Sequence, residues 1–250
     1  MIKYLGMKKE IVMIHGWGTG SYNSNLDCKK VGENIAWSQR EALVSLLENK
    51  YTPRYFNLPG FCCVEEPKKA LFDLEDYSDS LENWIKEQKV KPAAIIGYSF
   101  GGAVALEYTV RHKSNIPVIL ISPALKRKES VKSQMGKICK HIVPKKYYDS
   151  LKSIYQTISN RYYREGTPFL RTSYDKIARR DIRPLLDMVD PKKLFLIYGD
   201  SDTSTPADYI SEIVEKKGLN CLIIKGGDHN IGKTHAEEVS QAIVNYLKDP

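Results

Sequence analysis

The sequence predicts an α/β protein with a mostly parallel sheet of about six strands, helices on both faces, and a helical insertion before the last two strands. Short and near-continuously apolar runs recur along the chain, as is typical of strands covered on both faces. Helical patterns fall between these runs, and this alternation favours a parallel, doubly wound sheet. The alternation stops between residues 123 and 190, where no strong strand signal is found.

The individual elements follow from these two periodicities. The expected strands share apolar and largely β-branched composition, and they are Ile11–Ile14, Tyr55–Phe56, Ala93–Ile96, Val118–Ile121, Leu194–Tyr198 and Cys221–Ile224. The expected helices share apolar residues at helical spacing, and they are Trp37–Glu48, Tyr77–Lys89, Phe100–Arg111, Pro206–Lys217 and Thr234–Lys248.

The segment 123–190 is interpreted as a helical lid inserted into a core formed by residues 1–122 and 191–250. It contains helical-looking polar runs that prolines 144, 168 and 184 are expected to break. Residues Thr19–Glu33 are expected to form a long loop rich in Ser, Asn and Gly. A chain of 250 residues with 42% hydrophobic content is long enough for one sizeable domain with such an insertion.

The cysteines and the apolar runs indicate a cytoplasmic protein with free thiols. The five cysteines are an odd number without metal-type spacing, and the adjacent pair Cys62 and Cys63 is poorly arranged for an ordinary disulfide. No apolar stretch approaches the roughly 18–20 residues that cross a bilayer. The first ten residues lack the apolar region of a secretion signal. No metal site and no transmembrane segment are therefore expected.

The net charge of +8 is unevenly placed. Between Pro123 and Lys193 there are 18 Lys or Arg residues against 7 Asp or Glu, so this segment, which contains the predicted lid, carries the whole basic excess. Such a segment is usually a solvated helical face, and the functional alternative is a docking surface for an acidic partner, an anionic substrate or an acidic membrane surface. Nucleic acid is not expected, because the tyrosines of this segment match no known binding module.

A serine lies in a tight turn between a predicted strand and a predicted helix. Gly97 and Gly101 flank Ser99 at two residues on either side, and a turn this short forces the serine into a strained backbone conformation. The strain presents the hydroxyl above the sheet, where the first free N–H groups of the following helix also point. The pattern predicts a nucleophile beside an anion site.

Further polar residues follow other expected strands and should meet Ser99 at one edge of the sheet. His15 to Gly18 follow the first strand, Asp200 and Asp202 follow the fifth, and Asp228 and His229 follow the sixth. A serine hydroxyl needs an adjacent base, a histidine can accept its proton, and a carboxylate can orient that histidine. The set predicts nucleophilic catalysis.

These residues resemble those of the α/β-hydrolases, and the chain order Ser, Asp, His matches that family. The resemblance implies Ser99 as nucleophile, Asp202 as acid and His229 as base, with the backbone N–H groups of Trp17 and Phe100 as the oxyanion hole. It extends over nearly the whole chain through the motifs HGWG at 15–18, NLPGF at 57–61, GYSFGG at 97–102, GDSD at 199–202 and GGDH at 226–229.

Other residues near these motifs receive different interpretations. Asp200 directly follows its strand and is the alternative acid, although it can instead bind loop N–H groups. Asp228 is adjacent to His229 and poorly placed to orient its ring. His15 is expected to stabilise the oxyanion turn rather than to catalyse. Cys62 stands where the family usually has Gly, a departure that bears on the substrate pocket.

The function expected from the resemblance is that of a lidded serine esterase, similar to carboxylesterases and to esterases of carrier-bound pimeloyl groups. The enzyme would cleave a small-molecule or carrier-bound acyl ester through an acyl-enzyme, without a cofactor. The same triad also serves C–C bond hydrolases, thioesterases and serine aminopeptidases, so the motif does not separate these reactions. A catalytically silent hydrolase-like protein that binds an acidic partner through its basic lid is the alternative from another class.

Overall fold

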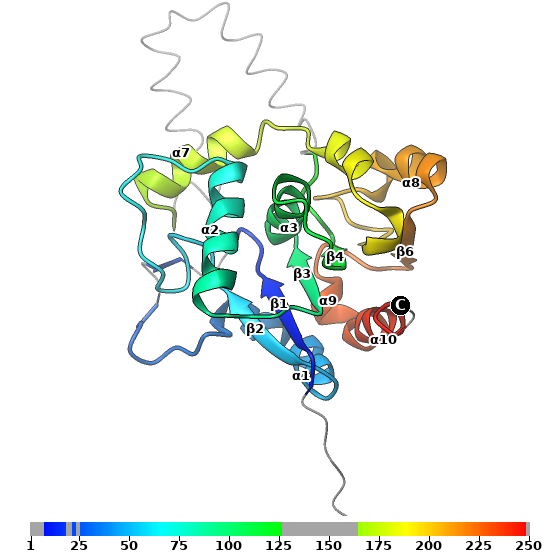
Figure 1. Cartoon of the computed structure of the whole chain (residues 1–250), viewed down its shortest axis with the longest axis horizontal. Coiled ribbons are helices and arrows are strands. Elements are labelled where there is room, and N and C mark those ends of the chain that lie inside the picture. The colour runs from blue at the N-terminus through cyan, green and yellow to red at the C-terminus, as the bar shows by residue number, and fades with distance from the viewer. Residues whose placement is uncertain (1–7, 19–21, 24–25, 127–164, 249–250) are drawn as a thin grey trace, which may run out of the picture.

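The protein contains a parallel sheet of six strands in the described residues, in the order β2-β1-β3-β4-β5-β6. The structure is a computed structural model that describes residues 8–18, 22–23, 26–126 and 165–248 (Figure 1). The predicted fold class is therefore confirmed. In chain order, the strands are β1 (Glu10–Ile14), β2 (Thr52–Phe56), β3 (Ala94–Tyr98), β4 (Val118–Ile121), β5 (Leu194–Gly199) and β6 (Asn220–Ile224).

The apolar runs form the central strands because both faces of the sheet are covered. Every residue of β3, β4 and β5 is buried, whereas the edge strands β2 and β6 are partly exposed. Along β1, Val12 and Ile14 pack on one side of the sheet, and Ile11 and Met13 pack on the other. This alternation follows from the two-residue period of a strand.

Two layers of helices cover the sheet (Figure 1). Helices α2 (Leu74–Glu87) and α3 (Phe100–Arg111) contribute to the core on one face, and α8 (Ser211–Lys217) packs against the same core. Helices α1 (Glu41–Glu48), α9 (Ile231–Thr234) and α10 (Ala236–Tyr246) contribute to the core on the other face. Each face of the sheet is thereby removed from water, which is the main driving force for this architecture.

Helix boundaries differ from the predicted ones where local capping or packing decides them. The helix α3 has the predicted bounds, but α2 begins at Leu74 because Asp73 and Asp76 form a capping box. Two predicted helices are each divided into two pieces, because a short 3₁₀ helix precedes the α-helix that packs on the sheet. These shorter pieces are η2 (Ile35–Arg40) and η5 (Ala207–Tyr209). The helix predicted over Thr234–Lys248 is α10, and the single turn α9 before it was not predicted.

The described part of the predicted lid is helical. It contains α7 (Pro168–Ile177) and the 3₁₀ helix η3 (Arg183–Met188), with no strand in residues 123–126 or 165–190. Pro168 and Pro184 do not break helices, because each lies in a first turn where a missing N–H costs nothing. Residues 127–164, including Pro144, lie outside the described residues, so the lid boundaries remain a prediction.

The helix α7 is tied to the segment around α2. The Ser173 hydroxyl accepts a hydrogen bond of 2.8 Å from the Phe72 amide, and the rings of Phe72 and Phe169 meet edge to face with centroids 5.4 Å apart. Arg180 and Glu75 form an ion pair at 2.6 Å. Hydrophobic and hydrogen-bonded contacts of α7, and the ion pair of Arg180 just after it, therefore join this part of the lid to the segment around α2.

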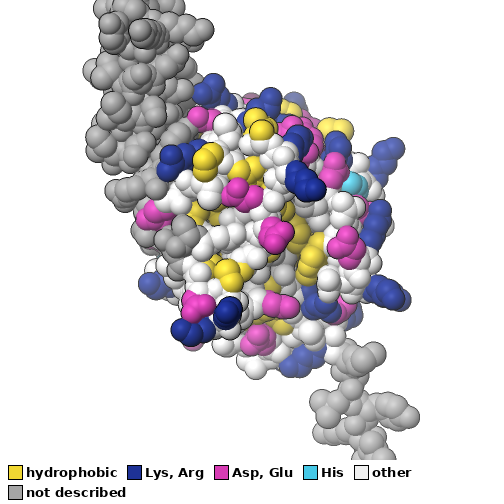
Figure 2. Space-filling model, turned by 90° about the vertical axis from the view of Figure 1, so that its left-hand side faces the viewer, with side chains coloured by type: hydrophobic (Ala, Val, Ile, Leu, Met, Phe, Trp, Pro, Cys, Tyr) yellow, Lys and Arg dark blue, Asp and Glu magenta, His cyan; other side chains and the backbone are white. Residues whose placement is uncertain are grey.

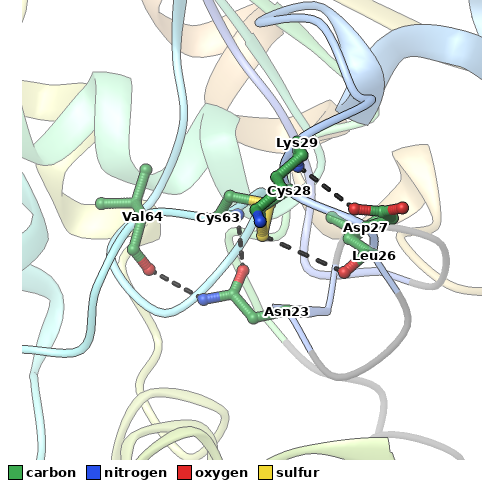
Figure 3. Close-up of a disulfide and its surroundings, with 7 residues drawn as sticks. All are labelled: Asn23, Leu26, Asp27, Cys28, Lys29, Cys63 and Val64. Atoms are coloured by element: carbon green, nitrogen blue, oxygen red, sulfur yellow. Dashed lines mark hydrogen bonds between the residues drawn. A yellow bond between two sulfur atoms is a disulfide. The ribbon is translucent and has the colours of Figure 1, made fainter.

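The expectation of free thiols is wrong for two cysteines, because Cys28 and Cys63 form a disulfide (Figure 3). The adjacency of Cys62 and Cys63 concealed this pairing, since the partner of Cys63 is 35 residues away in the long loop after β1. Among the described cysteines, Cys62 and Cys221 are not part of a disulfide, and Cys139 lies outside the described part. Disulfides are typical of oxidising compartments, so the cysteines no longer support the predicted cytoplasmic location.

Charged side chains of both signs are interspersed on the face shown in Figure 2. Exposed ion pairs join Lys69 to Asp76 at 2.5 Å and Arg111 to Asp79 at 2.7 Å. Ten of the 18 basic residues counted between Pro123 and Lys193 fall within 127–164, outside the described residues. The idea of a basic docking surface gains no support from the part of the lid that is described.

None of the described helices is both long and apolar enough to span a bilayer.

Candidate active site

Ser99 lies between β3 and α3 with backbone angles φ 53° and ψ −113°. A positive φ at a serine is strained, at a cost of about 1–3 kcal/mol, and such strain is often found at functional sites. The flanking glycines are required by close backbone packing. A Cβ on Gly97 would lie 2.4 Å from the Gly101 oxygen, and one on Gly101 would lie 2.2 Å from the Ile14 oxygen. The predicted turn is therefore present, with its serine held above the sheet.

The three residues of the predicted triad lie in hydrogen-bonding contact. His229 Nε2 is 3.1 Å from Ser99 Oγ, and His229 Nδ1 is 2.8 Å from Asp202 Oδ2. They follow β3, β5 and β6, so the parallel sheet brings their loops to one edge. The carboxylate accepts from Nδ1–H, which leaves Nε2 to accept the proton of the serine hydroxyl. The arrangement has the geometry of a nucleophile, a base and an orienting acid.

Asp202 is buried, with its side chain fully removed from solvent. Burial alone would raise the pKa of its carboxyl group, but His229 and the backbone and hydroxyl donors of Thr205 outweigh burial and lower this pKa to about 2. Its Oδ1 accepts hydrogen bonds of 2.8 Å and 2.9 Å from the amides of Ser204 and Thr205. The carboxylate is thus held ionised and in one orientation beside the imidazole.

The two other nearby carboxylates have separate partners. Asp200 Oδ1 accepts hydrogen bonds of 2.8 Å each from the Gly226 amide and the Ser201 hydroxyl. Asp228 is exposed and accepts from the Asn230 amide at 2.7 Å. Asp200 therefore ties two loops together, which agrees with the alternative role predicted for it. Asp202 is the carboxylate that contacts His229.

His15 is a buried, neutral histidine beneath the predicted oxyanion turn. Desolvation is the main cause that lowers its pKa to about 4. Nδ1 is 2.8 Å from the Gly16 carbonyl, which can only accept, so Nδ1 carries the proton. Nε2 then accepts a hydrogen bond of 3.1 Å from the Leu58 amide. His15 thus joins the turn after β1 to the loop after β2, in line with its predicted structural role.

The turn that carries Trp17 lies directly beside the serine. A Cβ on Gly16 would be 3.1 Å from Ser99 Cβ and 3.7 Å from Ser99 Oγ. Within the described part of the chain, the amides of Trp17 and Phe100 donate to no other protein group. The rings of these two residues meet edge to face with centroids 5.1 Å apart. Their role as oxyanion donors remains a prediction.

Two residues around the triad were missed by the sequence reasoning. The Thr205 hydroxyl is 2.7 Å from Asp202 Oδ2, and its position three residues after an aspartate is a turn signal that could have indicated it. The Tyr98 hydroxyl donates to the backbone carbonyl of His229 at 2.5 Å. No local signal predicts the second contact, because its partner is 131 residues away.

The described residues contain no group of three or more His, Cys, Asp or Glu side chains that could hold a metal ion. A cavity of about 340 Å³ lies at the opposite edge of the sheet, where Asn115 precedes β4 and Lys193 precedes β5. Ligands of parallel sheets bind at the carboxyl ends of the strands, so this cavity is separate from the candidate active site.

Comparison with known proteins supports the interpretation of the fold. Residues 10–136 match the family described as the alpha/beta hydrolase fold. A pimeloyl-[acyl-carrier protein] methyl ester esterase from Neisseria meningitidis is 26% identical over 254 residues, covering 92% of this chain and 90% of that protein. The match to this relative extends through the segment that contains Asp202 and His229.

Solved structures agree in fold. A bromoperoxidase from Bacillus anthracis has a TM-score of 0.67 at 18% identity, covering 98% of this chain and 93% of its own. An esterase from Exiguobacterium antarcticum has a TM-score of 0.63 at 18% identity, covering 98% and 94%. The chain belongs to the α/β-hydrolase fold family and is a hydrolase.

Proposed function

We propose that this hydrolase is a serine esterase in which Ser99 is the nucleophile, His229 the general base and Asp202 the acid that orients it. The observation that carries the proposal is the contact of 3.1 Å between Ser99 Oγ and His229 Nε2. The ionised Asp202 on the other ring nitrogen supports it, because that carboxylate favours the tautomer with a free Nε2 and stabilises the imidazolium.

In the first half of the reaction, Ser99 Oγ attacks the ester carbonyl while His229 Nε2 takes the hydroxyl proton. The carbonyl oxygen becomes an anion in the tetrahedral intermediate. The amides of Trp17 and Phe100 are the proposed donors to this anion, and the absence of another acceptor for them among the described residues supports that role. His229 then gives its proton to the leaving alcohol, and the acyl group stays on Ser99.

In the second half, water replaces the alcohol and the same groups act in the same order. His229 removes a proton from water, the hydroxide attacks the acyl-enzyme, and the carboxylic acid leaves as Ser99 regains its proton. The chain's own side chains and amides supply every step of this cycle. The proposal names no cofactor for that reason.

The proposed substrate is an ester of an acyl chain, either as a small molecule or bound to a carrier. The Neisseria meningitidis relative is named for a methyl ester of a carrier-bound pimeloyl group, and the alignment covers most of both chains.

If an acidic carrier binds through exposed basic residues, preference for the carrier-bound ester over the free ester will shrink as salt is added. A preference that is indifferent to ionic strength would leave the carrier without an electrostatic docking role.

A fluorophosphonate probe tests the proposed function directly, because it reacts with activated serines. We expect covalent labelling of the wild-type protein at Ser99 and none of Ser99→Ala. Hydrolysis of p-nitrophenyl esters of increasing acyl length, compared with matched thioesters and anilides, then ranks ester cleavage against the other reactions of this triad. A folded protein that is neither labelled nor able to hydrolyse any of these compounds would be a catalytically silent member of the family.

A further inference from the structure

The loop Asn57–Val64 supports the turn that carries the proposed oxyanion donor Trp17. The Leu58 amide donates to His15 Nε2 at 3.1 Å, and the Cys62 sulfur lies 3.7 Å from the same nitrogen. The Phe61 ring meets His15 and Trp17 edge to face, with centroids 5.6 Å and 5.1 Å apart. Because polar and aromatic contacts converge on both sides of Gly16, the position of this loop sets the position of the turn.

The same loop has a strained backbone. Cys62 and Cys63 have φ values of 51° and 66°, in the left-handed region that favours glycine. Cys62 occupies the position at which the sequence departs from the glycine usual in this family. Two consecutive residues with side chains keep this left-handed conformation only where the surrounding structure restrains them. Relaxation of either residue would move the sulfur of Cys62 and the ring of Phe61.

That restraint comes from the long loop after β1 (Figure 3). The disulfide joins Cys63 to Cys28, and Asn23 makes two hydrogen bonds to the strained segment, from its Nδ2 to the Val64 carbonyl at 2.8 Å and to its Oδ1 from the Cys63 amide at 2.6 Å. Tyr22 forms an antiparallel bridge with Phe61. Of these contacts, the disulfide is the covalent one, and it fixes one end of the strained pair.

We propose that the disulfide between Cys28 and Cys63 positions the Trp17 amide for oxyanion binding, so that the esterase is fully active only when this pair is oxidised. The proposal rests on the proposed function. Reduction by a dithiol such as dithiothreitol transfers two electrons and two protons to the disulfide, which yields two cysteine thiols and the cyclic disulfide of the reagent. The strained pair is then free to relax, and the turn at Gly16 loses its support.

The test compares the oxidised wild-type enzyme, the enzyme reduced by dithiothreitol, and the double variant Cys28→Ser, Cys63→Ser. Replacing both residues avoids a single thiol that could pair with Cys62. We measure kcat and KM with p-nitrophenyl butyrate, and inhibition by a trifluoromethyl ketone that forms a tetrahedral adduct. Mass spectrometry of the unreduced wild type checks that the link between Cys28 and Cys63 is present.

We expect kcat to fall about tenfold in the reduced enzyme and in the double variant, with weaker inhibition by the ketone and KM within about twofold. Complete loss of an oxyanion donor lowers kcat by about 10²–10³-fold, and displacement of a donor that remains should cost less. The double variant should be insensitive to dithiothreitol, and reoxidation by oxidised glutathione should restore the wild type. Cys221→Ser, which removes a free thiol on β6, is the matched control and should behave as the wild type.

A disulfide that only stabilises the fold would lower the melting temperature and leave kcat unchanged well below it. That result, or the absence of the link in unreduced protein, would overturn the proposal. If the double variant does not fold, the reduced wild type at low temperature still decides the question. Fluorophosphonate labelling separates the two hypotheses: no labelling of the oxidised wild type rejects the proposed function, whereas equal labelling rates before and after reduction reject only the disulfide's role.

Discussion

The hydroxyl of Tyr98 donates a hydrogen bond of 2.5 Å to the backbone carbonyl of His229. Tyr98 directly precedes the proposed nucleophile, so one turn presents Ser99 and also holds the loop of its base. The Arg40 guanidinium lies over the Tyr98 ring at 4.0 Å from its centroid, and it reaches Asn230 Oδ1 at 3.4 Å. These contacts link Tyr98, which precedes Ser99, to the loop that contains His229 and Asn230.

Tyr98→Phe removes this hydroxyl and keeps the buried ring. We expect kcat to fall about three- to tenfold with little change in KM, because one hydrogen bond contributes about 0.5–1.5 kcal/mol and the loop of His229 loses its anchor. Tyr246→Phe is the matched control, since that hydroxyl donates to the Lys192 carbonyl at 3.0 Å, away from the site. Equal effects of the two substitutions on kcat would show that Tyr98 does not position the base.

The two aspartates after β5 should differ sharply when each is changed to asparagine. We expect Asp202→Asn to lower kcat by about 10⁴-fold, because an amide cannot hold the imidazole in the required tautomer. Asp200→Asn should retain most activity and lose some stability, because Asp200 binds the Gly226 amide and not His229. Steady-state kinetics and thermal unfolding of both variants check this. An inactive Asp200→Asn with an active Asp202→Asn would reverse the assignment.

The stability of the protein should depend on pH through His15. Its folded-state pKa of about 4 is below its unfolded value of about 6.5, so the unfolded chain binds a proton that the folded chain excludes. The unfolding free energy should therefore fall as pH decreases from about 6.5 to 4. Chemical denaturation of wild type and His15→Gln across this range measures the effect. A slope that is equally steep in the variant would show that another group is responsible.

Gly16 and Gly18 provide a paired test of the oxyanion turn. A Cβ on Gly16 would meet Ser99 Cβ at 3.1 Å and the Tyr98 oxygen at 3.3 Å, whereas the nearest atom to a Cβ on Gly18 is at 4.0 Å. We expect Gly16→Ala to slow fluorophosphonate labelling of Ser99 about tenfold or more, because the turn must move away from the serine. Gly18→Ala should label at close to the wild-type rate. Similar rates for both variants would argue against a tightly packed turn.

Much of the candidate site could be predicted because its parts follow strands in sequence. Parallel strands place their carboxyl ends at one edge, so Ser99, Asp202 and His229 could be assigned to a common rim from the strand pattern alone. The choice between Asp200 and Asp202 depended on the family resemblance. The contact between Asp202 and His229 is a finding of the structure.

Features that depend on long-range contacts were beyond the sequence. The disulfide joins Cys28 to Cys63 through a loop with no periodic pattern, and local reasoning about adjacent cysteines led to the wrong expectation of free thiols.

One local feature was also misplaced. The predicted start of α2 was three residues too late, although the aspartates of its capping box were visible in the sequence.

The sequence by itself determined the order of strands and helices, the strained serine turn and the set of polar residues at one edge, because these depend on periodicity and short-range sterics. Only the tertiary structure decided which carboxylate contacts His229, how Tyr98 holds its loop and which distant cysteine pairs with Cys63. Those relationships are contacts between segments far apart in the chain, and their geometry is set by packing of the whole fold.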